Sequence, residues 1–297
     1  MRKFTSARSR KGWRSGALVA GVAALALLTG CSVGSGPDAG NSNDGSNGDS
    51  SVKGSTWADV QARGVINIGV GLTTPPYGQT GKDGNPAGYD VDVAQELADF
   101  LGVKAHIFEV SADGRIPAIQ SGKADVISFT LTHTPERAQQ IDFSSDTMNT
   151  YQAVAVRKDS DITNVDQIAD KIVAVQKGAI SATVTPQAYP GVNMQQYDTA
   201  VAVRLAVQQG QADAAVDSVS VLQYAISSDP DSNLHILDGV IGEKQAYGLG
   251  LAKGNDTLKE KVDEFLKDFH SKGEGKKLYE KWFGQPAPAD VFAGLED

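Results

Sequence analysis

The alternation of short apolar runs with amphipathic stretches constrains the fold of this chain most. Residues 65–70 read V-I-N-I-G-V, which is typical of a buried strand, and residues 104–110 predict a second strand. Between them, residues 89–101 carry apolar side chains at helical spacing, and Gly102 follows as a predicted C-cap. Another strand is predicted over residues 125–129. This order predicts an α/β lobe with a mainly parallel sheet.

The same alternation continues through the second half of the chain. Strands are predicted over residues 152–156, 172–176 and 213–217, and a helix over residues 201–209. The length from residue 56 onward allows either one large domain or two lobes of moderate size. Sheets of this kind bind ligands at the carboxyl ends of their strands, so that edge is where a site is expected.

The segment Asp125–Ser145 contains the clearest functional pattern. Its apolar strand runs into the hydroxylated residues up to Thr134, and Pro135 then opens a helix for which Thr134 is the predicted N-cap. Helical side chains lean toward the N-terminus, so Arg137 is expected to point back over Thr130 and Thr132. A fixed guanidinium above a strand end rich in hydroxyl groups suits a small carboxylate, which it can hold through two parallel hydrogen bonds.

Two other interpretations of these motifs were weighed. Arg137 could form an ordinary ion pair with Glu136 or Asp142, and that alternative stays open on this segment alone. The G-V-G sequence after the first strand does not predict a dinucleotide loop. The third glycine position is Thr74, and the following Pro-Pro pair prevents an immediate helix.

The N-terminus has the pattern of a lipoprotein signal peptide. Residues 1–30 hold six Lys and Arg residues and no acid, and an apolar run over residues 17–28 ends in L-T-G before Cys31. This pattern resembles a lipobox, so Cys31 is expected to be the lipid anchor, with an incidental cysteine after an ordinary signal peptide as the alternative. Cys31 is the only cysteine, which excludes a disulfide.

Amino-acid composition predicts the character of residues 31–55 and limits the classes of partner that the protein can bind. Residues 31–55 are rich in Gly, Ser, Asn and Asp and predict a flexible tether. The formal charge of −9 becomes −15 when the six positive charges of residues 1–30 are removed. Such an acidic surface argues against a nucleic-acid partner. Four histidines far apart in the sequence give no support for a metal site.

Five motifs read G-V-G-L-T-T-P-P-Y, G-Y-D-V-D-V-A, R-I-P-A-I-Q-S-G-K-A-D-V-I, S-F-T-L-T-H-T-P-E-R-A-Q-Q-I-D-F-S-S and, near the C-terminus, K-W-F-G. Together they resemble the extracellular solute-binding proteins of family 3, the polar amino-acid-binding proteins of ABC importers. The resemblance covers residues 66–284. It implies a type II periplasmic-binding-protein-like fold of two α/β lobes joined by a two-strand hinge. Lobe 1 would comprise residues 56–151 and 248–297, and lobe 2 residues 152–247.

The resemblance also implies a ligand-binding site between the lobes. Its expected residues are Thr74, Arg115, Thr130, Thr132, Arg137, Gly178, Ile180 and Asp217. Ile180 stands where the family usually has Thr, so only a backbone contact is expected there. Thr74 and Ala112 stand where members often carry aromatic residues that enclose the ligand side chain.

The residue that binds the ligand ammonium is left open between Asp217 and Ser218. The family motif D-A-V-V-V-D-S is one residue longer than D-A-A-V-D-S in this chain. Because side chains alternate along a strand, a slip of one residue would turn the carboxylate to the other face. Asp217 is preferred because an ammonium needs a negative partner.

Two further positions bear on selectivity. Members that bind cationic amino acids usually carry an acid where this chain has Gly71, and members that bind acidic amino acids carry an arginine at the position of Arg115. The alternative for Arg115 is a solvated arginine at a helix start. These features predict an acidic or amide ligand rather than a cationic one.

The resemblance implies a monomeric amino-acid-binding lipoprotein at the extracellular face of the cell membrane, which delivers its ligand to an ABC permease with its ATPase subunits. No cofactor and no catalytic activity are expected. The alternatives are a periplasmic-type cyclohexadienyl dehydratase and a ligand-sensing module for a signalling partner.

Overall fold

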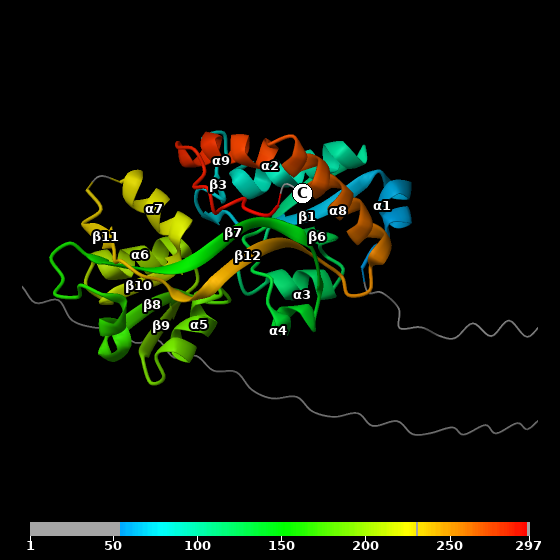
Figure 1. Cartoon of the computed structure of the whole chain (residues 1–297). Helices are drawn as coiled ribbons and strands as arrows, with labels where there is room; N and C mark the ends of the chain where they lie inside the picture. The colour runs from blue at the N-terminus through cyan, green and yellow to red at the C-terminus, as the bar shows by residue number, and fades with distance from the viewer. Residues whose placement is uncertain (1–53, 230, 296–297) are drawn as a thin grey trace, which may run out of the picture. The chain divides into compact units, whose positions relative to one another are not determined.

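The computed structural model describes residues 54–229 and 231–295 as an α/β fold with two lobes (Figure 1). The predicted signal peptide, Cys31 and the predicted tether up to residue 53 lie outside the described residues. A mixed sheet of nine strands runs through both lobes, in the order β5-β1-β6-β12-β7-β10-β8-β9, with β11 paired to β7. Among the described helices, none is long and apolar enough to cross a membrane.

The first lobe is built on parallel strands with helices on both faces. Its strands are β1 (Val65–Val70), β5 (Lys104–Glu109) and β6 (Val126–Ile127), beside a small sheet of β2 (Thr73–Thr74), β3 (Gly78–Thr80) and β4 (Pro86–Ala87). Its helices are α1 (Trp57–Arg63), α2 (Tyr89–Leu101), α3 (Arg115–Gln120), α4 (Pro135–Ala138), α8 (Asp256–Ser271) and α9 (Glu274–Phe283). Strand β1 pairs in parallel with both β5 and β6. Because α8 and α9 pack in the same core as β1 and α2, the chain returns to this lobe near its C-terminus.

Two apolar cores lie on the two faces of the first lobe's sheet. Successive side chains of a strand point to opposite faces, so Val126 joins the core under α2, α8 and α9, whereas Ile127 joins the core under α3. Helix α2 ends as the sequence predicts, because Gly102 adopts a left-handed φ of 68°. Phe100 lies at the edge of this helix, with its ring tilted against Phe265, and stays 44% exposed.

The second lobe repeats the plan. Its strands are β8 (Ile172–Gln176), β9 (Asn193–Tyr197), β10 (Ala214–Ser218) and β11 (Leu234–Ile236). Its helices are η1 (Val165–Asp170), α5 (Ser181–Ala188), α6 (Ala200–Gln208) and α7 (Val219–Ser227). Strand β8 pairs in parallel with β9 and β10. Ala215 packs toward α6 and α7, while Val216 packs on the other face, against η1 and α5 residues.

Two long strands join the lobes. Strands β7 (Asp142–Arg157) and β12 (Ile241–Leu251) run antiparallel to each other from one lobe into the other (Figure 1). Strand β7 also pairs antiparallel with β10, and β12 pairs antiparallel with β6, so these two strands make the sheet mixed beside the parallel strands that the sequence predicts for the first lobe. The predicted lobe limits, at residues 151/152 and 247/248, fall within these two strands.

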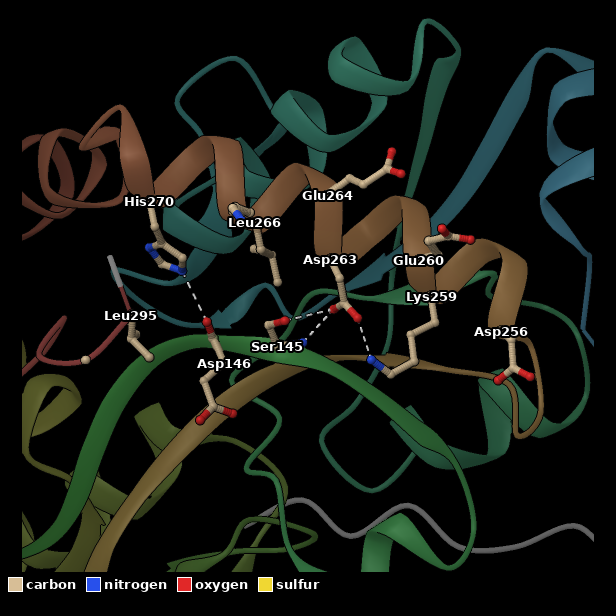
Figure 2. Close-up of a pocket in the computed structure, with 12 residues that line it drawn as sticks. Ser145, Asp146, Asp256, Lys259, Glu260, Asp263, Glu264, Leu266, His270 and Leu295 are labelled. Carbon is tan, nitrogen blue, oxygen red and sulfur yellow. Dashed lines mark hydrogen bonds and ion pairs between the residues drawn. The ribbon is translucent and has the colours of Figure 1, made fainter. Parts of the chain in front are cut away.

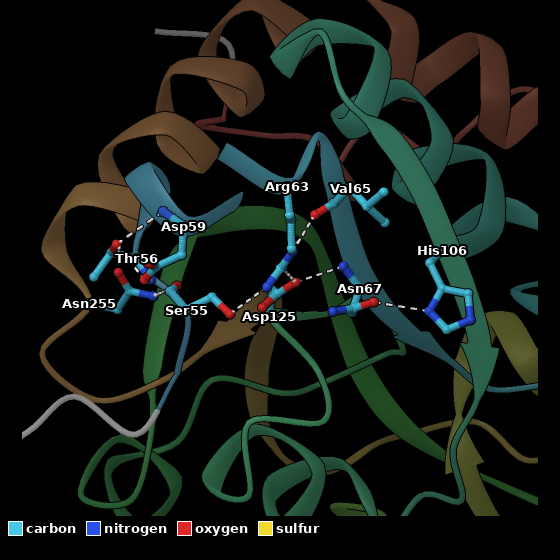
Figure 3. Close-up of polar contacts among 9 residues, drawn as sticks. All are labelled: Ser55, Thr56, Asp59, Arg63, Val65, Asn67, His106, Asp125 and Asn255. Carbon is cyan, nitrogen blue, oxygen red and sulfur yellow. Dashed lines mark hydrogen bonds and ion pairs between the residues drawn. The ribbon is translucent and has the colours of Figure 1, made fainter. Parts of the chain in front are cut away.

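An ion pair fixes α1 to the sheet of the first lobe. Arg63 at the end of α1 pairs with the carboxylate of Asp125, which is 2% exposed (Figure 3). The same carboxylate accepts the N–H of Asn67 at 2.7 Å, and Arg63 also donates to the Ser55 hydroxyl at 2.7 Å. Helix α1, strand β1 and the segment before β6 are thereby joined through one buried acid.

Replacing Asp125 should test how much this network stabilises the lobe. Asp125→Ala should lower the free energy of unfolding by about 3 kcal/mol, the lower end for a broken buried ion pair, because Arg63 can still reach water. Urea denaturation would measure the loss. Asp83→Ala is the control, because Asp83 is exposed and contacts only Asn85 in its own turn. Equal urea midpoints for Asp125→Ala and wild type would show that this network does not stabilise the lobe.

Candidate functional site

A small cavity lies where the strand ends of the two lobes meet. Six of the eight predicted site residues line it: Thr74, Arg115, Thr130, Thr132, Ile180 and Asp217. Its other lining residues are Ala112, Gln152, Gln176, Ala179, Ser218, Val221 and Tyr247. About 20 Å³ of the cavity is accessible, which is room for about one water molecule, so in this structure the two lobes lie close together around the site.

Arg137 and Gly178 lie beside the cavity and are joined to each other. As the sequence predicts, Thr134 caps α4 by accepting the Arg137 N–H at 3.3 Å, and the guanidinium points back over the preceding strand end. Its Nη1 donates to the Thr132 carbonyl at 2.9 Å, and its Nη2 donates to the Gly178 carbonyl at 3.1 Å. Arg137 therefore contacts both lobes through backbone carbonyls.

Arg115 makes a similar but more extensive set of contacts. Its Nε donates to the Ala112 carbonyl at 2.7 Å, and its Nη1 donates to the carbonyls of Phe129 and Thr130, both at 3.0 Å. Its Nη2 donates to the Gly178 carbonyl at 2.7 Å. Burial, with the nearby charge of Arg137, lowers the pKa of Arg115 to about 9, so it still carries its charge at neutral pH.

Gly178 of the second lobe packs closely against the first lobe. Its φ is +75°, and a Cβ there would lie 2.6 Å from the backbone N and Cα of Asp113. Lys177 forms an ion pair with Asp113 at 2.7 Å just outside the cavity. A second polar contact joins the lobes where the Tyr77 hydroxyl meets that of Ser220 at 2.8 Å.

Thr130 has an unusual backbone conformation. Its φ of +32° is the only positive value for a non-glycine residue in the described ranges. Its N–H donates to the carboxylate of Asp90 at 3.0 Å, while Arg115 holds its carbonyl. Burial raises the pKa of Asp90 to about 7, against the opposing effects of the Thr130 N–H and of Arg115.

Both candidates for the ammonium partner line the cavity. Asp217 is 8% exposed, and its Oδ1 accepts the Ser218 N–H at 2.7 Å. Burial raises the pKa of Asp217 to about 6, although that N–H and the charge of Arg204 act in the opposite direction. The two residues thus line the same cavity at the end of β10, although side chains alternate along a strand.

Three polar lining residues were missed by sequence analysis: Gln152, Gln176 and Tyr247. Gln152 is 1% exposed, and its Nε2 has no partner among the described residues; the same holds for the Thr74 hydroxyl. Gln152 lies on β7 and Tyr247 on β12, so the cavity floor is formed partly by the strands that join the lobes. The sequence around Tyr247 reads A-Y-G-L-G, and nothing in this pattern indicates a contact with the cavity.

A wider hollow lies outside this site, along α8 (Figure 2). Several of its polar groups bind one another. Asp263 accepts the Ser145 N–H at 2.6 Å and pairs with Lys259, and the His270 ring contacts the Asp146 carbonyl at 3.1 Å. None of the predicted site residues lines this hollow, and its contacts fix α8 to β7.

Comparison with known proteins agrees with this geometry. Residues 66–285 match the bacterial extracellular solute-binding proteins, family 3. The chain belongs to this family. It is 31% identical over 246 residues to the ABC transporter glutamine-binding protein GlnH of Bacillus subtilis, which covers 80% of this chain and 89% of GlnH.

Two further relatives come from other bacteria. The chain is 30% identical over 267 residues to the L-cystine-binding protein TcyJ of Escherichia coli, covering 89% of this chain and 94% of TcyJ. The crystal structure of a cysteine-binding protein from Campylobacter jejuni superposes with a TM-score of 0.74 at 30% identity, over 79% of this chain and 97% of that one. This family member therefore has the two-lobed α/β fold of amino-acid-binding proteins.

Proposed function

We propose that this family 3 protein is a lipid-anchored amino-acid-binding subunit of an ABC importer. It binds one polar amino acid between its lobes at the extracellular face of the membrane and delivers it to a permease. The observation that carries this proposal is the interlobe cavity, which brings arginine, hydroxyl groups and a buried acid together where the two lobes meet. Relatives named for glutamine and cystine support the ligand class.

In this proposal the charged ends of the ligand are held by different groups. Arg137 binds the α-carboxylate together with the backbone N–H groups of Thr132 and Ile180. The ammonium is bound by Asp217, with the carbonyl of Thr130 and the hydroxyl of Thr132. Thr74 and Arg115 complete the first lobe's side of the site, and Gly178 completes the second lobe's side.

The ligand side chain is proposed to carry an amide or a carboxylate. A side chain at position 71, where cationic ligands would need an acid, has no room, because a Cβ there would lie 2.1 Å from the Phe129 ring. Two unpaired donors line the cavity instead: Gln152 Nε2 and the Thr74 hydroxyl. Buried donors without a partner favour a ligand that brings an acceptor.

Binding is coupled to closure of the lobes in this proposal. The ligand contacts both lobes, so it binds the closed form more tightly than the open form, and only that difference shifts the equilibrium. A difference of about 10⁴-fold would convert a mostly open population into a mostly closed one. The permease would then distinguish loaded from empty protein by shape.

A panel of amino acids tests the function directly. Isothermal titration calorimetry with glutamine, glutamate, aspartate, cystine, histidine and arginine should show binding of an amide or acidic amino acid and weaker binding of arginine. Arg137→Ala should cost roughly 2–5 kcal/mol of binding, or about 30- to 5,000-fold in affinity, because a charge-assisted pair in a desolvated site is lost.

Glu136→Gln on the same short helix is the matched control for Arg137→Ala and should bind like wild type. Unchanged affinity in Arg137→Ala would refute the carboxylate assignment, and tightest binding of arginine would refute the selectivity. Turnover of prephenate or arogenate without tight amino-acid binding would instead support the dehydratase alternative.

The pH dependence of affinity should identify the ammonium partner. If Asp217 binds the ammonium, affinity should rise as pH increases through about 6, because the carboxylate must be ionised. The facing groups Arg204 on α6 and Tyr247 on β12 keep their charge states in this range, and Asp90 on α2 titrates about one unit higher. Asp217→Asn should bind weakly without the step near pH 6, while Ser218→Ala should keep it. If Ser218→Ala binds weakly while Asp217→Asn binds like wild type, Ser218 is the ammonium partner.

A further inference from the structure

The peptide groups of Thr130 are held from both sides by buried charged residues. Asp90 Oδ2 accepts the Thr130 N–H at 3.0 Å, and Arg115 Nη1 donates to the Thr130 carbonyl at 3.0 Å. Thr130 itself lines the cavity in a conformation, φ +32°, that costs energy for a residue with a β-carbon. Such a conformation persists only where surrounding contacts fix it, and these two contacts do so.

The carboxylate of Asp90 is placed to hold the Thr130 N–H and does not face the cavity. It is 8% exposed, does not line the cavity, and lies in the first turn of α2. Its own N–H donates to the Tyr77 carbonyl at 2.9 Å, and its carbonyl accepts the Ser128 hydroxyl at 2.9 Å. Its backbone is thus anchored on both sides, and the carboxylate is fixed in direction toward Thr130.

Arg115 uses most of its donors on backbone carbonyls. Its contacts with Ala112, Phe129, Thr130 and Gly178 occupy four of the five N–H groups of a guanidinium. A bidentate grip on a ligand carboxylate would need two free N–H groups, so the contacts leave too few for one. This occupancy argues against the prediction that Arg115 selects an acidic ligand side chain.

We propose that Asp90 and Arg115 are positioning residues, which fix Thr130 in the conformation that faces the amino-acid ligand. Arg115 also joins this fixed peptide to the Gly178 carbonyl of the second lobe, so the arrangement of Thr130 is completed when the lobes meet. The ligand role of Thr130 rests on the proposed function. The hydrogen bond between Asp90 and the Thr130 N–H is independent of that function.

The first test is independent of any ligand. In the ¹⁵N-labelled protein, the amide shift of Thr130 should titrate with Asp90 near pH 7, because the charge of its acceptor changes. The ionisable groups facing Asp90 are Arg115 on α3, Tyr77 before β3, Tyr89 beside it on α2 and Tyr247 on β12, and all keep their charge states between pH 5 and 8. Asp90→Asn should abolish the titration.

Asp99→Asn is the matched control, because it removes one exposed acid from the same helix and should leave the Thr130 titration unchanged. A raised pKa means that the fold accepts a neutral side chain at position 90, so Asp90→Asn is expected to fold. A Thr130 shift that does not titrate, or that titrates equally in Asp90→Asn, overturns the proposal.

The second test measures affinity for the amino acid of the calorimetric panel that wild type binds best. Asp90→Asn keeps an oxygen acceptor and should stay within about threefold of wild type at pH 8. Asp90→Ala and Arg115→Lys lose contacts to Thr130 and should weaken binding about tenfold or more, the equivalent of 1.4 kcal/mol. Equal affinity of Asp90→Ala and wild type overturns the proposal. Absence of binding by wild type overturns the proposed function, while the amide titration still decides whether Asp90 holds Thr130.

Discussion

Both arginines of the site meet the second lobe at one carbonyl group, that of Gly178, which accepts a hydrogen bond from each of them. Both arginines belong to the first lobe, and the carbonyl belongs to the second. The contact needs glycine for two reasons: the backbone is left-handed, and any Cβ would meet the backbone of Asp113. A single backbone group therefore joins both cations of the site to the second lobe.

The strands that join the lobes are part of the same cavity. Gln152 on β7 and Tyr247 on β12 line it, and neighbouring residues of these strands form the passage between lobes. A change in lobe angle would move these side chains relative to Asp217 and Thr130. Ligand contacts and hinge geometry are thus linked through covalently continuous strands, which is the physical basis of the coupling between binding and closure proposed here.

Local patterns in the sequence predict local structure well in this chain. Thr134 and Pro135 specify the start of α4, and the lean of helical side chains then places Arg137 over Thr132. Long-range features are different. Nothing near Asp90 in the sequence indicates that its carboxylate meets Thr130, forty residues away, and Phe100 fits a helical face but lies at its exposed edge. Six of the predicted site residues line one cavity. They could be predicted together because the family resemblance carries long-range information, which the periodicity of the sequence lacks.

The central claim is that the lobes close on an amino acid through the Gly178 contact, and small-angle scattering of the protein with and without that amino acid tests it most directly. The account predicts that the radius of gyration of wild type falls at saturating ligand, and that Gly178→Ala, which would clash with Asp113, stays at the larger value. Gly191→Ala is the control, because Gly191 also has a positive φ but open space around its Cβ position, so this variant should close like wild type. An unchanged radius for wild type, or full closure of Gly178→Ala, would contradict the account.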